Sequence, residues 1–365
     1  MIAADEAAAR PVERSQLHEW WRFFSTLVLI LSPALIAFAA LEGLAWWTGE
    51  SMSVAAASRW QDGAPGRIWR GGDGHSFLPY KLARVADLRP EVLVLGPSRA
   101  NQFSAKPFAP YSFYDAGQTA WTLDQYRRFL ELITRDGYTP EVMVINLDYW
   151  MFSPGFDHYW GDRFDDAPSP HIAALLRVVG QLRDNPLALW RRLPAADRLQ
   201  GLYAVLTGDG FRADGSMMEK PATADPQQRL SEDNAEVGVP PVVVADHMSP
   251  DQIANFDKLV ALAKEKNVAL IAVQLPYYDK ILKALNDSPD AGNWREFESA
   301  EWRHRLADSG VLFFDFADMP DYRDKPEYFL DSLDPDRRVV NHISRVILAD
   351  PRVAALLPQA ATAAK

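Results

Sequence analysis

The chain has 365 residues, of which 48% are hydrophobic and 24% are charged. This balance is ordinary for a folded protein and excludes both wholesale disorder and a polytopic membrane protein, while the length suits one large domain or two small ones. Subtracting 49 acidic from 38 basic residues gives a net charge of −11, which repels phosphate backbones, so we expect no nucleic-acid partner. The absence of cysteine excludes disulfides, thiolate metal sites and a cysteine nucleophile.

Residues 23–41 form an apolar run of 19 residues without a charged side chain. At about 1.5 Å per residue, a helix of this length spans about 28 Å, close to the hydrocarbon core of a bilayer. Tryptophans flank the run, as in interfacial belts (Trp20, Trp21, Trp46, Trp47). We predict an uncleaved transmembrane helix at residues 23–47, after an N-terminal tail at residues 1–22. A cleaved signal peptide is the alternative, because Ala37-Phe38-Ala39 resembles a processing site, although such signals usually have a shorter apolar region.

Residues 48–88 are rich in Gly, Ala and Ser and show little periodicity, which predicts a linker. Strands and helices then alternate. Short β-branched apolar runs predict strands at 91–96, 141–147, 268–275 and 311–316, and amphipathic spacing predicts helices at 122–136, 249–266, 299–309 and 337–348. Capping boxes mark the starts of two of these helices (Thr122 with Gln125, Ser249 with Gln252). The alternation predicts an α/β domain at residues 89–355 with a doubly wound parallel sheet.

Residues from about 157 to 248 interrupt this alternation. A helical stretch is expected at 171–193, interrupted at Asn185-Pro186, and another near 196–206, followed by a polar stretch at 208–236. We interpret the whole segment as a helical insertion in the α/β domain. The Ala-rich residues 356–365 are expected to form a flexible tail.

Ligands of open parallel sheets bind beyond the carboxyl ends of the strands, so the residues that follow each strand are the candidates for a site. The first strand ends in Gly96-Pro97-Ser98-Arg99, which places a serine hydroxyl next to free amides, although a helix cap would have the same appearance. The second exit contains Gly117, and the third contains Asn146 and Asp148; a plain turn and a structural role are the respective alternatives. The segment 329–335 before the last helix carries two carboxylates, Asp331 and Asp334.

Together, these four segments resemble the four blocks of the SGNH (GDSL-like) hydrolase superfamily, over roughly residues 90–350. The resemblance is to its membrane-anchored periplasmic branch, which includes the D-alanine transfer protein of teichoic acid modification and the alginate acetylation proteins. It implies a three-layer flavodoxin-like fold and chemistry on acyl groups, above all acetyl. It also implies a single-pass protein of the inner membrane, with residues 1–22 as a cytoplasmic tail and the domain in the periplasm. Carried over by residue, it makes Ser98 the nucleophile, its own amide and that of Gly117 the oxyanion donors, and Asp331 the group that orients a histidine. Arg99, Asn146 and Asp148 would lie around the substrate.

The sequence departs from this family at two positions. Asp334 stands where the family places its catalytic histidine, and a carboxylate cannot relay a proton as an imidazole does near neutral pH. Asp148 stands where the family has an asparagine, and its charge would repel a developing oxyanion unless it is protonated or turned away. Two other histidines are candidates for the base. His342 lies about 12 Å further along the last helix, which is too distant unless the segment loops back, and His75 lies in the linker. A surface or packing role is the alternative for each.

Two hypotheses follow. In the first, the chain is a membrane-anchored acyltransferase or esterase that carries an acyl group on Ser98, with a membrane-embedded acyl donor protein and an envelope glycan as partners. In the second, the chain keeps the fold without the chemistry and serves as an accessory subunit of a membrane complex. Asp334 favours the second hypothesis, and the turn at Ser98 favours the first. We expect neither a metal nor a cofactor in either case, because no spacing matches a metal loop or a nucleotide-binding motif.

Overall fold

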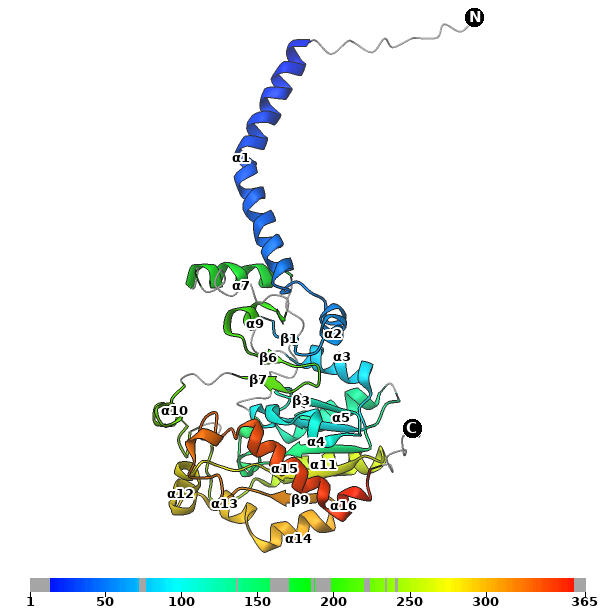
Figure 1. Ribbon diagram of the computed structural model, residues 1–365, viewed down its shortest axis with the longest axis vertical. Helices are drawn as coiled ribbons and strands as arrows, with labels where there is room; N and C mark the ends of the chain where they lie inside the picture. The colour runs from blue at the N-terminus through cyan, green and yellow to red at the C-terminus, as the bar shows by residue number, and fades with distance from the viewer. Residues whose placement is uncertain are drawn as a thin grey trace, which may run out of the picture.

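The computed structural model describes residues 14–71, 77–135, 137–157, 171–184, 187, 198–219, 224–233, 235–239 and 242–357. Figure 1 shows a long helix, α1 (Arg14–Trp47), that rises from a small upper layer, and below this layer a larger body built around a sheet. The upper layer contains α2 (Val54–Asp62), α7 (His171–Asp184) and α9 (Leu202–Thr207). The His75 part of the predicted linker, and most of the predicted flexible tail, lie outside the described residues.

The larger body contains a sheet of five parallel strands in the order β3-β2-β4-β8-β9. The strands are β2 (Val92–Gly96), β3 (Phe113–Gly117), β4 (Val142–Asn146), β8 (Ala269–Gln274) and β9 (Leu312–Asp315). The predicted α/β architecture with a parallel sheet is therefore confirmed. Four of these strands, β2, β4, β8 and β9, lie within the ranges predicted from apolar runs. The fifth, β3, is an edge strand of the sheet and ends directly before Gln118.

Both faces of the sheet are buried, which explains why its strands are continuous apolar runs. Leu93 and Leu95 of β2 belong to a core on one face, and Val92 and Val94 belong to a core on the other. The first core is completed by α3 (Leu78–Leu88), α5 (Leu123–Thr134), α11 (Pro250–Glu265), α12 (Asp279–Asp287), α13 (Gly292–Phe297) and α14 (Ala300–Asp308). The second is completed by α4 (Ala105–Phe108), α15 (Arg337–Ala349) and α16 (Pro351–Ala354).

The prediction that residues 48–88 are only a linker is wrong. They form α2, the short strand β1 (Ile68–Trp69) and α3, and β1 pairs with strands of the insertion in a second sheet of order β5-β1-β6-β7. These partners are β5 (Leu199–Gln200), β6 (Gly210–Phe211) and β7 (Met217–Met218). The segment is held by an apolar cluster that includes Ala57, Phe77 and Tyr80. It is also held by polar contacts: the buried Lys81 Nζ donates to the carbonyl oxygens of Asp115 at 2.7 Å and Gly215 at 2.5 Å.

The helix predictions differ in detail from the structure. The capping box of Thr122 and Gln125 is present, with the Gln125 amide 3.2 Å from Thr122 Oγ1. The second capping box is absent: the Ser249 side chain makes no cap bond, and Gln252 Nε2 donates instead to Asp157 Oδ2 at 2.7 Å. Within the insertion, α7 ends at Asp184, directly before the predicted interruption at Asn185-Pro186. The strand β5 precedes α9 where one helix was expected, and α10 (Pro226–Glu232) falls in the stretch expected to be polar.

Helix α1 contains a 30-residue stretch, His18–Trp47, that is long and apolar enough to cross a membrane, the one such helix among the described residues. The most apolar part of this stretch is not buried against the rest of the chain, and Pro33 lies within the helix. A core helix of a soluble protein would be covered, so the exposure of this apolar surface fits a lipid environment.

Candidate functional site

The polar strand ends meet where the order of the sheet reverses. From β2 the chain passes to β3 on one side and later to β4 on the other, so a crevice is expected beyond the carboxyl end of β2. A cavity of about 80 Å³ lies there. Its lining combines a hydroxyl, a guanidinium and a carboxylate with three aromatic rings (Pro97, Ser98, Arg99, Trp121, Trp150, Phe156, Leu333, Asp334).

Ser98 and Asp334, which are far apart in the chain, come together in this cavity. Ser98 is the first residue of the short helix η1 (Ser98–Gln102) that follows β2, and Asp334 lies in the loop before α15. Burial and the neighbouring Asp331 raise the pKa of Asp334 well above its usual range, while Arg99 and a hydrogen bond from the Ser98 side chain act in the opposite direction. A hydroxyl therefore lies next to a buried carboxyl group that gains protons readily.

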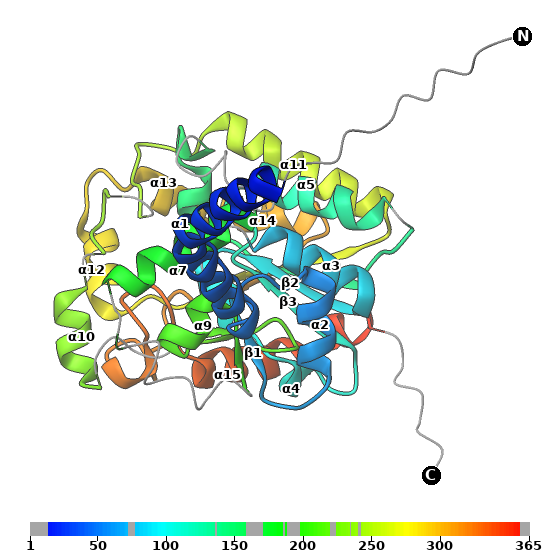
Figure 2. The same cartoon turned by 90° about the horizontal axis from the view of Figure 1, so that it is seen from above.

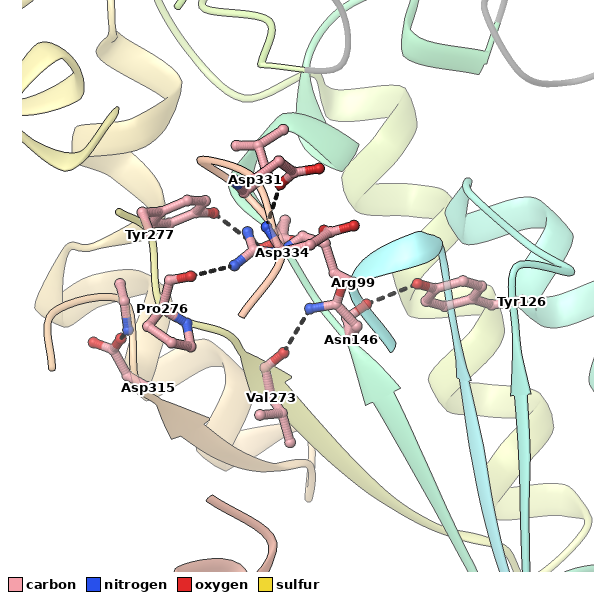
Figure 3. Close-up of polar contacts among 12 residues, drawn as sticks. Arg99, Tyr126, Asn146, Val273, Pro276, Tyr277, Asp315, Asp331 and Asp334 are labelled. Carbon is pink, nitrogen blue, oxygen red and sulfur yellow. Dashed lines mark hydrogen bonds and ion pairs between the residues drawn. The ribbon is translucent and has the colours of Figure 1, made fainter. Parts of the chain in front are cut away.

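Asp331 shapes the loop that carries Asp334. Its Oδ1 accepts the backbone amides of Leu333 at 2.8 Å and Asp334 at 2.7 Å, as Figure 3 shows for the second bond. The loop closes through a bond from the Leu330 amide to the Asp334 carbonyl oxygen at 2.8 Å. Burial raises the pKa of Asp331, and these two amide bonds oppose the rise. Asp331 thus positions an aspartate rather than orienting the histidine that the resemblance implied.

Arg99 and Asp148 form a fully buried ion pair, with Arg99 Nη1 3.0 Å from Asp148 Oδ1. Arg99 Nη2 donates to the Pro276 carbonyl oxygen at 2.8 Å (Figure 3), and the Tyr277 hydroxyl donates to Asp148 Oδ1 at 2.9 Å. Burial raises the pKa of Asp148, and the Arg99 charge lowers it. The expected repulsion between Asp148 and an oxyanion is therefore offset by Arg99, and two of the Arg99 nitrogens are engaged by protein groups.

Asn146 and Gly117 do not have the free donors that were expected of them. Asn146 Nδ2 donates to the Val273 carbonyl oxygen at 3.1 Å, and the backbone carbonyl oxygen of Asn146 accepts a hydrogen bond from the Tyr126 hydroxyl at 2.7 Å (Figure 3). The Gly117 amide donates to Asp115 Oδ1 at 2.6 Å. Since an oxyanion donor must be directed at the substrate, the assignment of Gly117 to an oxyanion hole disagrees with this structure. Burial raises the pKa of Asp115 to about 8.

No histidine of the described residues lines the cavity. His342 is exposed on α15 and packs its ring against Tyr322, with 5.7 Å between the ring centroids. It is thus a surface residue, and the structure gives it no part in the cavity. His75 lies outside the described residues.

Sequence reasoning missed two aromatic residues of the cavity, Trp121 and Phe156. Trp121 immediately precedes the cap of α5 and is half-exposed, whereas Phe156 and Trp150 are buried. Their positions in loops that follow strands of a parallel sheet were the available signal. The cavity as a whole offers a hydroxyl with an adjacent proton acceptor inside an aromatic enclosure, which suits nucleophilic chemistry on a small group.

Comparison with known proteins adds no assignment: no protein-family model matches the chain, and no curated protein matches it.

Proposed function

We propose that this chain is a membrane-anchored SGNH-like protein of the inner membrane that carries a small acyl group on Ser98, on the periplasmic side, and transfers it to or from an envelope glycan. The observation that carries the proposal is that Ser98 and Asp334 line the same cavity at the switch point of the sheet. The strand order supports a three-layer flavodoxin-like fold, since numbering the five strands along the chain gives 2-1-3-4-5.

The size of the cavity favours a short acyl group. Its volume of about 80 Å³ is smaller than an apolar cavity that holds benzene, about 150 Å³, and larger than the share of one water molecule in the liquid, about 30 Å³. An acetyl group has three heavy atoms and suits this range, whereas a long acyl chain does not.

In this proposal Asp334 serves as the base. Its carboxylate takes the proton of the Ser98 hydroxyl as Oγ forms a bond to the acyl carbonyl carbon, and the protonated carboxyl then gives that proton to the leaving oxygen of the donor. A general base works best when its pKa lies near the operating pH, and the burial that raises the pKa of Asp334 acts in that direction. An aspartate thus replaces the histidine of the family in the same place.

Covalent labelling tests the nucleophile. We expect a fluorophosphonate or an activated acetyl ester to modify the full-length protein at Ser98, detected by intact mass and peptide mapping. Ser98→Ala should abolish this modification, while Ser231→Ala, on the exposed helix α10, should leave it unchanged. Absence of any Ser98 adduct under conditions that label an active serine hydrolase would contradict the enzyme proposal.

The pH dependence of labelling tests the base. Only ionised Asp334 accepts a proton, so the initial labelling rate of Ser98 should rise as the pH increases through the pKa of Asp334. Asp334→Asn should lower the rate by about 10²–10⁴-fold and remove this dependence. Asp334→His should restore labelling, with a midpoint near the imidazole pKa of about 6.5. A rate that is equal in the wild type and in Asp334→Asn at every pH would assign the base elsewhere.

The accessory-subunit function is the second candidate, because the Gly117 amide is bound to Asp115 and no described histidine lines the cavity. In this case the cleft and α1 would dock onto a membrane complex, and catalysis would reside in the partner. Ser98→Ala should then be silent in cells, whereas deletion of residues 1–47 should abolish function. The pair of variants separates the two candidates, because the enzyme proposal requires both to be inactive.

A further inference from the structure

Helix α7 of the insertion lies across the lower end of α1, and Figures 1 and 2 both show the crossing. One side of α7 is buried in an apolar cluster, with Leu175 and Val178 in contact with the last turns of α1 and with α9. The contributing residues of α1 are Leu41, Leu44 and Ala45. This packing fixes α7 against the helix that is apolar enough to cross a membrane.

A second side of α7 is apolar and uncovered. Leu176 is 65% exposed and Val179, one turn further along, is 42% exposed, so the two form a stripe next to the buried one. Leu187, just beyond the helix, is 63% exposed. Viewed along the direction of α1, α7 lies on the face of the molecule from which α1 rises (Figure 2). Exposed apolar stripes of this kind mark contacts with a protein or a membrane.

The position of α7 along α1 indicates which of these contacts applies. Leu41 is the last residue of the uncharged run, and it packs against the same cluster as α7. From Leu41 to Trp47 at the end of α1 the rise is about 9 Å, comparable to the 5–8 Å that the headgroup region adds on each side of a bilayer. Trp46, at this level, is 77% exposed, as expected for an interfacial aromatic residue. Helix α7 therefore lies at the depth of the membrane surface.

We propose that α7 is a second membrane contact that lies in the plane of the bilayer surface, with Leu176 and Val179 inserted at the boundary between headgroups and acyl chains. The inference requires α1 to span the membrane but not the chemistry at Ser98. Amphipathic helices bind this boundary through buried apolar area. With a net charge of −11 on the chain, attraction to anionic lipids contributes little, so the apolar stripe is the source of the contact.

Site-directed spin labelling tests this contact, and the absence of cysteine lets each label be introduced into the unmodified chain. Leu176→Cys and Val179→Cys would be labelled in the full-length protein and reconstituted in phosphatidylethanolamine and phosphatidylglycerol vesicles. Val346→Cys is the matched control, because Val346 is an apolar helix residue with 41% exposure on α15, in the larger body. Leu35→Cys, in the apolar run of α1, is the lipid-exposed reference.

We expect labels at 176 and 179 to collide with lipid-soluble oxygen several-fold more often, relative to a water-soluble nickel complex, than the label at 346 does. Their depth should be shallower than that of the label at 35. If both labels behave like the one at 346, the proposal is overturned. The same result is expected if the stripe binds a protein partner in cells instead of the membrane. Circular dichroism identifies variants that do not fold, and quenching of a fluorophore at 176 by doxyl-labelled lipids provides a second readout that decides in the same way.

Discussion

Replacing Asp148 with alanine is expected to lower the free energy of unfolding by about 3–5 kcal/mol, because the variant leaves the Arg99 guanidinium buried without its counterion. Both side chains of this pair are excluded from solvent, at 2% and 0% exposure. The other hydrogen bond of Arg99, to the Pro276 carbonyl at 2.8 Å, and its contacts with the rings of Trp150 and Tyr277 are with neutral groups. Asp334 also attracts Arg99, but burial raises the pKa of Asp334 well above its usual range, so it is a poor substitute for the Asp148 carboxylate. Denaturant unfolding of the full-length protein in one fixed detergent measures the loss.

Two controls show whether the loss comes from the unpaired charge. Asp184→Ala removes a carboxylate from the exposed pair with Arg183, where little or no loss of stability is expected because solvent screens the pair. The double variant Arg99→Met with Asp148→Leu removes both charges and should recover most of the stability lost by Asp148→Ala. A double variant that is less stable than Asp148→Ala would mean that the shape of these side chains, rather than their charge, stabilises the site.

Gly215→Ala is expected to destabilise the fold by about 2–5 kcal/mol, for two reasons that add. Gly215 has φ of +83°, where a residue with Cβ is strained, and a Cβ there would lie 2.1 Å from the carbonyl oxygen of Asp115. That oxygen belongs to β3 and also accepts Lys81 Nζ at 2.7 Å, so it cannot move without disturbing the sheet edge and a buried cation. Thermal or denaturant unfolding provides the measurement.

Gly137 is the matched control, since its φ is +74° and nothing lies within 4 Å of the position of its Cβ. Gly137→Ala therefore reports the conformational cost alone, about 1–2 kcal/mol. The difference between the two variants measures the close approach of the insertion to β3. Equal losses in both variants would show that the loop around Gly215 is free to shift away from the sheet.

Four strands of the larger sheet were predictable because they are covered on both faces, which leaves apolar runs such as residues 91–96 in the sequence. The range of β3 was not predicted, because Asp115 interrupts its apolar residues. The smaller sheet was not, because strands of two residues, such as Ile68–Trp69, are too short to show any period. The burial of Lys81 has no signal in the sequence either: the structure places its ammonium group on backbone carbonyls, and burial lowers its pKa to about 8.

The same distinction applies to the candidate site. The topology of a parallel sheet brings the residues after its strands to one edge, so the approach of the loop at Asp334 to Ser98 could be predicted. The direction of each side chain could not. Whether Asp148 faces a substrate or Arg99 depends on packing between residues 49 positions apart in sequence, and the bond between the Gly117 amide and Asp115 depends on the local path of the backbone.

Hydrogen bonds fix the end of α1 to the insertion, so the two are not joined by a flexible linker alone. The Gly201 amide donates to the Thr48 carbonyl oxygen at 2.7 Å, and the Leu202 amide donates to Glu50 Oε2 at 2.8 Å. If α1 spans a bilayer, these bonds hold the cavity beside Ser98 at a fixed distance from the membrane surface, so the cavity does not move through a larger volume. Ser98 would then meet only substrates that are presented at this distance from the membrane. Lengthening or shortening the junction between α1 and the insertion would therefore change which substrates reach Ser98.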